Sequence, residues 1–409
     1  MDPRIAEEHL EELARLTDTA GGRVVAVVRQ RLSSPSPKTY IGEGKTEELR
    51  LVVESSEADL VIFDEELSPA QGKNLEQQTG ARVMDRAELI LDIFATRARS
   101  KESRMQVELA QLQYLLPRLK RMWSHLSRIR GGIGLRGPGE TQLETDRRLI
   151  GTRIADLRRK LRDVARAREI QRQSRQGEFR AALVGYTNAG KSSLLRALSG
   201  ADVFVEDRLF ATLDSMTRSV DLGDGYAVLV TDTVGFIRKL PHHLVASFRS
   251  TLEEAREADV LLHVIDASHP DREEQEEVVA EVLRELELDR RPQILVYNKI
   301  DRLTHDEEAA LRDRVRAFEP VPAVFVSAHQ PETLSSLLDA LKARVRAQLR
   351  EVELRLPSRD GEALALVYRE GEVLSRSDEG PYVTLTGRVS EPLLGRLLKR
   401  EGVEVVESS

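Results

Sequence analysis

The chain of 409 residues contains no cysteine, which excludes disulfide bonds, catalysis by a thiolate and zinc fingers with cysteine ligands. A chain without cysteine also fits a reducing compartment, so we expect the protein in the cytoplasm. No run of apolar residues approaches the roughly 18 residues that a membrane-spanning helix needs. The first residues, Met-Asp-Pro-Arg followed by glutamates, lack the basic and apolar regions of a signal peptide. We therefore expect a soluble protein with no membrane span.

A large excess of charge of one sign is also missing. The 62 Lys and Arg residues nearly balance the 69 Asp and Glu residues, so the formal net charge is −7, which disfavours a surface that binds nucleic acid everywhere. Residues 101–177 nevertheless carry 19 basic and 8 acidic side chains, a net charge of +11, which leaves −18 on the rest of the chain. The sequence therefore predicts one basic segment between acidic parts.

The length of the chain favours two to four domains. Residues 1–100 alternate strand and helix patterns, which predicts a small α/β domain with a parallel sheet. The expected elements of this domain are strands at 24–28 and 60–64 and helices at 45–57, 67–78 and 86–96. Residues 101–177 instead repeat apolar side chains at spacings of three and four on both sides of a glycine-rich stretch, 131–139. That pattern predicts an antiparallel hairpin of paired helices with a glycine-rich tip.

Residues 178–348 form the longest α/β stretch, and residues 349–409 form a small α+β domain. Short apolar runs with helical patterns between them predict the strands of the α/β stretch. These strands are expected at 179–184, 227–231, 260–265, 294–297 and 323–326. In the last segment we expect strands near 352–356 and 383–386.

A phosphate-binding loop follows the first strand of the α/β stretch. Gly185-Tyr186-Thr187-Asn188-Ala189-Gly190-Lys191-Ser192 fits G-x-x-x-x-G-K-[ST], and Ser193 opens the helical pattern that comes next. The glycines let backbone amides point at phosphate oxygens, and the lysine reaches the β- and γ-phosphates. The Ser192 hydroxyl is a candidate ligand for Mg²⁺, and the helix N-terminus favours the bound anion.

A second motif, Asp232-Thr233-Val234-Gly235, follows the strand that ends at Thr231. An aspartate at this place can hold Mg²⁺ through water, and the Gly235 amide can reach a γ-phosphate. The same four residues can also form a plain turn, but their position after a phosphate loop and at a strand end favours the nucleotide site.

A third motif selects the base. Asn298-Lys299-Ile300-Asp301 follows the fourth strand, and the Asp301 carboxylate can accept hydrogen bonds from both N1–H and the N2 amine of guanine. Adenine offers no such donor pair, so GTP is expected rather than ATP. The Lys299 stem can pack on the base. Ser327-Ala328, after the last strand, would support the base through a backbone amide.

Together these motifs resemble the translation-factor-like class of small GTPases. The switch I threonine must lie between Ser192 and Asp232, and Thr212 and Thr217 are both candidates. Phe210-Ala211-Thr212-Leu213-Asp214 resembles switch I of the HflX family, which implies that Thr212 binds Mg²⁺. Further stretches similar to that family are Thr-Tyr-Ile-Gly-Glu-Gly-Lys at 39–45, Leu-Ser-Pro-Ala-Gln at 67–71 and Gly-Pro-Gly-Glu-Thr at 137–141. The resemblance covers about residues 20–350.

The resemblance implies an α/β architecture: a P-loop GTPase domain preceded by a small α/β domain and a long helical hairpin, and followed by a small α+β domain. Members of the family are ribosome-associated GTPases that bind the large subunit and can split ribosomes under stress. GTPases that act in ribosomal subunit assembly, and regulatory adaptors whose docking on a protein is controlled by nucleotide, remain alternatives. We expect a monomer whose basic hairpin and N-terminal domain bind ribosomal RNA of the large subunit.

Two residues bear on catalysis. Many GTPases orient the attacking water with a glutamine after D-x-x-G, whereas this chain has Phe236, which cannot polarise water. Catalysis would then depend on Lys191, Thr212, Gly235 and a partner, and intrinsic hydrolysis should be slow. Asn188 resembles GTPases that use a potassium ion in place of an arginine finger, although an asparagine can also simply stabilise the turn.

The charged residues of the hairpin allow two interpretations. Its charges can form a solvated face between domains, or its arginines can contact RNA phosphates, which guanidinium groups bind in a bidentate manner. The arginines and lysine that the second reading uses are Arg121, Arg128, Arg130, Arg136, Arg158, Arg159, Lys160 and Arg162.

Overall fold

The computed structural model describes residues 3–122, 138–173, 178–201, 208–239 and 254–406. It divides into two compact units, which are described separately below. The first contains Met1–Arg166, Glu206–Asp214 and Lys239–Ser250, and the second contains Ala167–Val205, Ser215–Arg238 and Thr251–Ser409. The expected α/β fold class is confirmed, whereas the four domain boundaries stay a prediction. No helix in the described ranges is long and apolar enough to cross a bilayer.

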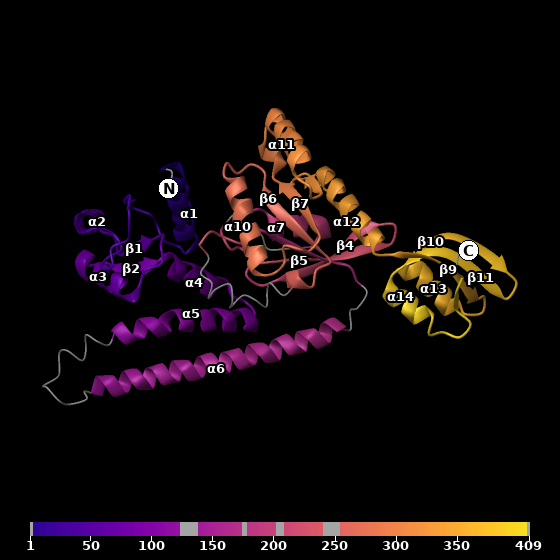
Figure 1. Ribbon diagram of the computed structural model, residues 1–409, viewed down its shortest axis with the longest axis horizontal. Helices are drawn as coiled ribbons and strands as arrows, with labels where there is room; N and C mark the ends of the chain where they lie inside the picture. Colours follow the sequence, from indigo (N-terminus) through magenta and orange to yellow (C-terminus); the bar gives the residue numbers. More distant parts are fainter. Residues whose placement is uncertain (1–2, 123–137, 174–177, 202–207, 240–253, 407–409) are drawn as a thin grey trace. The chain divides into compact units, whose positions relative to one another are not determined.

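The first unit begins with a small α/β layer (Figure 1). Its elements are α1 (Pro3–Thr19), α2 (Glu43–Ser56), β1 (Leu60–Phe63), α3 (Pro69–Thr79), β2 (Arg82–Asp85) and α4 (Arg86–Arg97). β1 and β2 pair in parallel, with Leu60 opposite Arg82. A capping box between Ser68 and Gln71 starts α3, and Gly80 ends it with a φ of 77° that favours glycine.

The strand expected at residues 24–28 is wrong. In the structure residues 24–28 form no strand and belong to none of the sheets. Val24, Val25 and Val27 are 43%, 49% and 53% exposed. An apolar run alone therefore did not identify a strand in this part of the chain.

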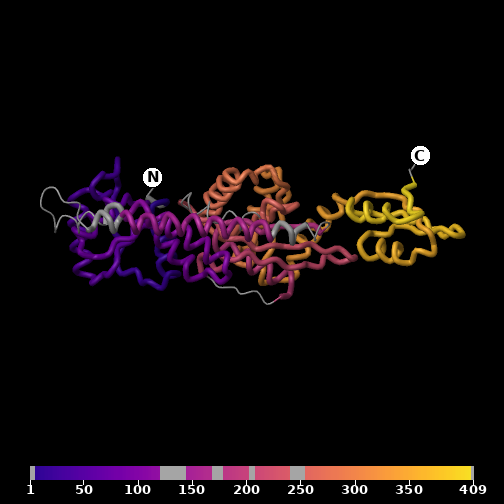
Figure 2. Tube along the Cα trace, turned by 90° about the horizontal axis from the view of Figure 1, so that it is seen from below, coloured from indigo at the N-terminus to yellow at the C-terminus, as the bar shows by residue number. Residues whose placement is uncertain are grey.

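Two long helices follow, α5 (Lys101–Met122) and α6 (Pro138–Gln173), and α6 belongs to the first unit as far as Arg166. They run side by side in both views (Figures 1 and 2). The seam between them buries Leu109, Ile154 and Leu157, with Met105, Leu112, Leu116, Ile150 and Leu161 packed around these three. This confirms the paired helices. The glycine-rich tip and the side chains of Arg121, Arg128, Arg130 and Arg136 lie outside the described residues.

The second unit is built on a six-stranded sheet in the order β4-β5-β3-β6-β7-β8. Its strands are β3 (Arg180–Gly185), β4 (Met216–Gly223), β5 (Tyr226–Asp232), β6 (Val260–Asp266), β7 (Gln293–Asn298) and β8 (Ala323–Phe325). All neighbours pair in parallel except β4, which is antiparallel to β5. The carboxyl ends of the parallel strands therefore meet at one edge, where ligands bind in such sheets.

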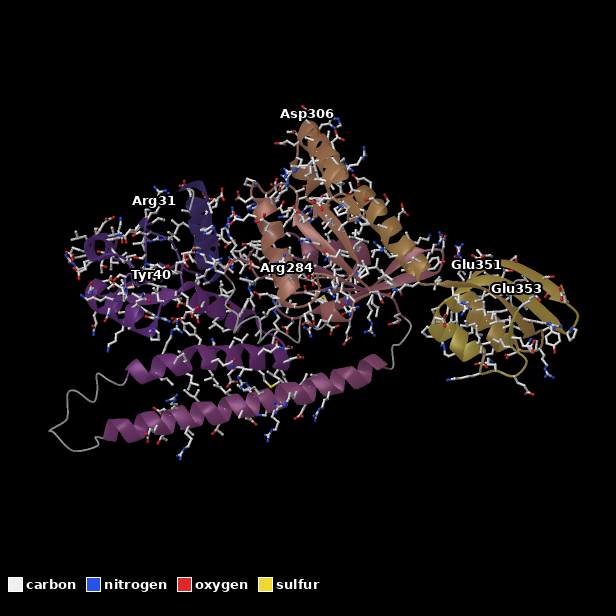
Figure 3. The ribbon with its side chains drawn as sticks, in the orientation of Figure 1. Arg31, Tyr40, Arg284, Asp306, Glu351 and Glu353 are labelled. Atoms are coloured by element: carbon white, nitrogen blue, oxygen red, sulfur yellow. The ribbon has the colours of Figure 1, made fainter. Side chains whose placement is uncertain are left out.

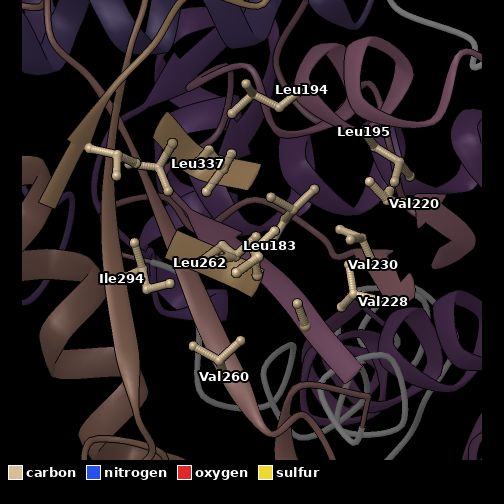
Figure 4. Packing of buried hydrophobic residues seen from close by; sticks show 14 of the residues in the cluster. Leu183, Leu194, Leu195, Val220, Val228, Val230, Val260, Leu262, Ile294 and Leu337 are labelled. Atoms are coloured by element: carbon tan, nitrogen blue, oxygen red, sulfur yellow. The ribbon is translucent and has the colours of Figure 1, made fainter. Parts of the chain in front are cut away.

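Helices pack on both faces of this sheet. They are α7 (Lys191–Ser199), α10 (Arg272–Glu285), α11 (His305–Phe318) and α12 (Ser335–Ala347). Leu183 and Leu262 of the central strands pack with Leu194 of α7 and Leu337 of α12 in one core (Figure 4). Ile265 and Leu295 face the other way and pack with Leu311 of α11. The strands are buried on both faces, which explains why they are continuous apolar runs in the sequence.

The last part of the second unit follows a β-α-β-β-α-β order. Its elements are β9 (Arg350–Pro357), α13 (Gly361–Glu370), β10 (Glu372–Glu379), β11 (Tyr382–Val389), α14 (Glu391–Leu397) and β12 (Glu404–Val406). The strands form an antiparallel sheet in the order β10-β11-β9-β12. Val352 and Leu354 pack with the helices, whereas Glu351 and Glu353 alternate with them and lie on the opposite face (Figure 3). The expected α+β segment is confirmed.

Candidate functional site

The predicted phosphate loop joins β3 to α7. Gly185 has a φ of 150°, and a Cβ atom on it would lie 2.2 Å from the Val264 carbonyl oxygen. Gly190 has a φ of 97°, and a Cβ atom there would lie 2.2 Å from Nδ2 of Asn298. Both positions therefore require glycine. Because α7 begins at Lys191, the N–H groups of its first turn lie at the end of the loop, where they favour a bound anion.

The Lys191 side chain is buried at the base of this loop. Its Nζ donates to the carbonyl oxygens of Gly185 at 3.1 Å and of Tyr186 at 2.8 Å. Burial lowers the pKa of Lys191 to about 8, with a further lowering by Lys299 and an opposing effect of Asp232. The Lys191 ammonium group thus donates to carbonyl oxygens of the loop, and phosphate oxygens of a bound nucleotide can take the place of these acceptors.

Ser192 and Asp232 meet beside the lysine. The Ser192 hydroxyl donates to Oδ2 of Asp232 at 2.6 Å, and the aspartate is almost fully buried. Asp232 is placed by the end of β5, while the next residue, Thr233, is fixed because its hydroxyl donates to the Leu183 carbonyl oxygen at 2.7 Å. A hydroxyl and a carboxylate oxygen at this spacing are the hard oxygen ligands that suit Mg²⁺.

Gly235 and Phe236 connect the second motif to the phosphate loop. The Thr187 N–H donates to the Phe236 carbonyl oxygen at 2.7 Å, and the Phe236 N–H donates to the Gly185 carbonyl oxygen at 3.0 Å. A Cβ atom on Gly235 would lie 2.7 Å from Cα of Thr187 and 2.9 Å from Nζ of Lys191. Phe236 is 2% exposed, so its ring is buried in the protein.

The third motif is hydrogen-bonded to the other two segments of the site. Asn298 donates from Nδ2 to the Ala189 carbonyl oxygen at 2.9 Å and accepts from the Ala328 N–H at 3.2 Å. Lys299, with a φ of 65°, donates from Nζ to the Asn188 carbonyl oxygen at 2.8 Å. The structure thus brings the predicted base-binding residues against the phosphate loop.

Asp301 lies at the open side of this group. Its carboxylate accepts a hydrogen bond from the Ser327 hydroxyl at 2.5 Å, and the residue is exposed. The Ser327 N–H in turn donates to the hydroxyl of Thr333 at 2.8 Å. An exposed carboxylate can accept hydrogen bonds from N1–H and the N2 amine of guanine.

Sequence reasoning missed two residues of this site. Asp266, at the end of β6, accepts from Nζ of Lys299 at 2.7 Å and so fixes the lysine over the loop. Its position at the carboxyl end of a buried parallel strand was a usable signal. Thr333 is the other, and its place in the short 3-10 helix η3 (Pro331–Leu334) has no pattern that indicates a role.

The predicted switch I residues belong to the other unit. The described part of this stretch, residues 208–214, packs in the first unit, where Leu209, Phe210 and Leu213 are buried. The Asp214 carboxylate accepts hydrogen bonds from residues that precede α5, namely Arg99 and Ser100. Burial raises the pKa of Asp214, but these hydrogen bonds outweigh that effect and lower the pKa overall. The geometry described above is therefore that of the second unit, and the role of Thr212 stays a prediction.

A phosphate loop, a D-x-x-G segment and an N-K-x-D segment at the carboxyl ends of a parallel sheet define a P-loop GTPase. Three family models match the chain: GTP-binding GTPase N-terminal at residues 7–95, GTP-binding GTPase Middle Region at 97–175 and 50S ribosome-binding GTPase at 180–299. The chain is 46% identical to the GTPase HflX of Magnetococcus marinus, over 99% of this chain and 95% of that protein.

The chain is also 46% identical to the GTPase HflX of Escherichia coli K12, over 88% of this chain and 85% of that protein. Among solved structures, it is similar to a GTP-binding protein from Sulfolobus solfataricus in complex with GDP. That likeness has a TM-score of 0.44 and 26% identity, and covers 83% of this chain and 96% of the other. The chain belongs to the HflX family of GTPases, and it binds and hydrolyses GTP.

Proposed function

We propose that Ser192, Thr212 and Asp232 hold the magnesium ion that accompanies GTP. The hydroxyl and carboxylate oxygens of Ser192 and Asp232 already lie 2.6 Å apart, and Thr212 would join them from the 208–214 segment when GTP is bound. The ion would supply positive charge that offsets the negative charge developing on the phosphate. Ser192→Ala should therefore weaken GTP binding in magnesium buffer, and it should have a much smaller effect in EDTA.

In this proposal the nucleotide lies along the P-loop, residues 185–193, with its base against Asn298–Asp301 and Ser327–Ala328. Asp301 selects guanine because its carboxylate accepts both N1–H and the N2 amine. Asp301→Asn should lower the affinity for GTP and raise it for xanthosine triphosphate, whose O2 can accept from the new amide. The test measures both affinities, and an unchanged GTP affinity would refute the assignment.

Hydrolysis depends on backbone groups and Lys191 in this proposal. The Gly235 amide would bind the γ-phosphate, Lys191 would stabilise the charge that leaves with it, and Thr212 would close the site. Phe236 cannot orient water, because its ring is buried and its backbone is hydrogen-bonded to the loop. Intrinsic hydrolysis should therefore be slow and should depend on a partner for its acceleration.

We propose that the partner is the large ribosomal subunit, contacted by the basic hairpin and the N-terminal domain. The observation that carries this proposal is the charge of α6: Arg158 and Arg162 are exposed, and among the described residues neither has an ion pair. By contrast, Arg159 and Lys160 both pair with Asp156. Unpaired arginines on a helix of net positive charge suit RNA phosphates. The family model of the nucleotide domain is likewise named for 50S ribosome binding.

The experiment measures single-turnover GTP hydrolysis with and without purified large subunits, together with subunit binding at several salt concentrations. Arg158→Ala with Arg162→Ala should weaken binding and reduce the slope of log affinity against log salt by roughly 0.7–0.9 per lost phosphate contact. The matched control is Arg284→Ala, which removes an exposed arginine on α10 (Figure 3). Equal hydrolysis rates with and without subunits would contradict the proposal.

We further propose that the GTP-bound form splits idle or stalled 70S ribosomes in the cytoplasm. Sedimentation with GTP or a non-hydrolysable analogue separates this function from the alternatives. Splitting should convert 70S particles to subunits, whereas an assembly factor should bind immature subunits and a protein adaptor should do neither.

A potassium ion beside Asn188 is a further part of the proposal. The Asn188 carbonyl oxygen accepts from Lys299, so the backbone of this residue is fixed with a φ of 61°. A side chain held in this way can contribute one oxygen to a cation at the phosphates. Hydrolysis should then be faster in potassium than in sodium at equal ionic strength, and Asn188→Ala should remove the difference.

A further inference from the structure

The predicted magnesium ligand Thr212 lies between two anchor points in the first unit. On one side, the Phe210 ring packs edge-on against Phe94 of α4, with ring centroids 4.7 Å apart. On the other side, the Asp214 carboxylate binds the residues that start α5. The residues on either side of Thr212 thus contact α4 and the two residues that precede α5.

The Asp214 carboxylate and the Ser100 hydroxyl both accept hydrogen bonds from backbone N–H groups at the start of α5. Oδ2 of Asp214 accepts from the backbone N–H groups of Arg99 at 3.0 Å and Ser100 at 3.2 Å, and Oδ1 accepts from the Ser100 hydroxyl at 2.5 Å. The same Ser100 oxygen accepts the Ser103 N–H at 3.0 Å in the first turn of α5. A carboxylate at this end of a helix is also favoured by the helix dipole.

A second contact of the same kind follows the D-x-x-G motif. Lys239, four residues after Gly235, belongs to the first unit and donates from Nζ to Asp64 at 2.6 Å and to Glu65 at 2.7 Å. Asp64 in turn accepts from the buried Arg86 at 2.7 Å. The chain segments that flank both phosphate-sensing motifs are therefore anchored in the first unit.

We propose that Asp214 is a positioning residue that couples the nucleotide to the hairpin: through Ser100, it ties the Thr212 loop to the start of helix α5. The coupling rests on the proposed role of Thr212 in sensing GTP, but not on any role of the ribosome. When GTP draws Thr212 toward the phosphates, the Asp214 carboxylate moves with it or releases α5. In either case the start of the hairpin helix responds to the nucleotide.

The test is hydrogen exchange by mass spectrometry on the full chain, with GDP and with a non-hydrolysable GTP analogue. In the wild type, exchange should differ between the two nucleotides in two peptides, 208–216 and 97–106. In Asp214→Ala, the difference in 208–216 should persist, while the difference in 97–106 should shrink at least threefold. Ser100→Ala should act in the same direction, because it removes the hydroxyl that donates to Asp214 and accepts from the Ser103 N–H.

If Asp214 only stabilised the start of α5, without coupling it to the nucleotide, the exchange data would differ from this. Loss of Asp214 would then raise exchange in 97–106 equally with both nucleotides and leave their difference unchanged. Asp360→Ala is the matched control, because Asp360 caps α13 through the Ala363 N–H at 3.0 Å and should alter neither peptide.

Three outcomes would overturn the proposal. A wild type in which 208–216 responds and 97–106 does not would show that the Asp214 contact transmits nothing. An undiminished difference in 97–106 of Asp214→Ala would show that another contact carries the coupling. A wild type in which neither peptide responds would refute the role of Thr212 as well, which distinguishes failure of the proposed function from failure of the coupling.

Discussion

His263 should make the nucleotide-binding sheet sensitive to acid. The residue lies in the middle of β6, opposite Val184 of β3 and Leu295 of β7, and is 6% exposed. Burial lowers the pKa of His263 to about 4, and the charge of Lys191 lowers it further. The folded sheet therefore contains a neutral imidazole, whereas the unfolded chain binds a proton near pH 6.5.

The direction of the pH dependence follows from this difference between the pKa values of His263 in the folded and unfolded states. Between the two pKa values the unfolded state binds more protons, so the free energy of unfolding falls as the pH falls. A shift from about 6.5 to about 4 corresponds to roughly 3.4 kcal/mol in total. Between pH 7.5 and pH 5.0 the loss from this residue alone should be about 2 kcal/mol, since the folded form is still neutral at pH 5.0.

Hydrogen exchange of the β3 and β6 amides in the nucleotide-free protein gives the free energy of opening this sheet at each pH, after correction for the intrinsic exchange rate. In His263→Leu, the fall between pH 7.5 and pH 5.0 should be smaller than in the wild type by about 2 kcal/mol. His305→Gln is the control, because His305 is exposed at the start of α11. If wild type and His263→Leu lose the same free energy, the imidazole is not the source of the acid sensitivity.

Two of the three remaining predictions concern the nucleotide site, and the third concerns a carboxyl group on α10. Gly235→Ala should lower GTP hydrolysis more than tenfold, measured by phosphate release, because the new Cβ would lie 2.9 Å from Nζ of Lys191 and 2.7 Å from Cα of Thr187; a rate within twofold of wild type would contradict this. Asn298→Ala should weaken the binding of GTP and of GDP by the same amount, about 1–3 kcal/mol in a calorimetric titration, since the Ala189 carbonyl and the Ala328 amide lose a buried partner. Weaker binding of only one of the two nucleotides would contradict this structural role of Asn298. Partial burial, and then the charge of Glu319, raise the pKa of Glu276 on α10 to about 7. A carboxyl NMR titration of labelled protein should therefore find Glu276 half-protonated near neutrality, and a midpoint near 4.5 would refute the raised pKa.

Much of the nucleotide domain could be predicted because its central strands are buried on both faces. A strand such as Val260–Asp266 is apolar along its whole length, and the polar residue that ends it lies at the ligand edge. β4 was missed for the opposite reason. It is an edge strand whose residues alternate between buried and exposed, and its sequence Met-Thr-Arg-Ser-Val-Asp-Leu-Gly is half polar.

The contacts that the sequence could not predict join residues far apart in the chain. Lys299 and Asp266 are separated by 33 positions, and Ser100 and Asp214 by 114. Neither pair belongs to a local motif, and charge alone gives no reason to match Asp214 with one helix start among many. The motif that contains Asp214 resembles the family's switch I, and in the structure its carboxylate accepts hydrogen bonds from Arg99 and Ser100, just before α5.

The strength of the Asp214 contact limits what it can transmit. Loss of a helix cap costs about 0.5–2 kcal/mol, and the coupling between two sites cannot exceed the free energy of the contact that joins them. One or two kcal/mol corresponds to a factor of roughly 5–30 in a population. A nearly complete switch of the hairpin would need about 5.5 kcal/mol, so Asp214 alone can only bias the equilibrium. The packing of Phe210 on Phe94 and the pairing of Lys239 with Asp64 are the contacts able to add to it, because each joins a switch-flanking residue to the first unit. Loss of Asp214 should therefore weaken the response of α5 without abolishing it, whereas Asp214→Ala combined with Lys239→Ala should reduce that response further than either change alone.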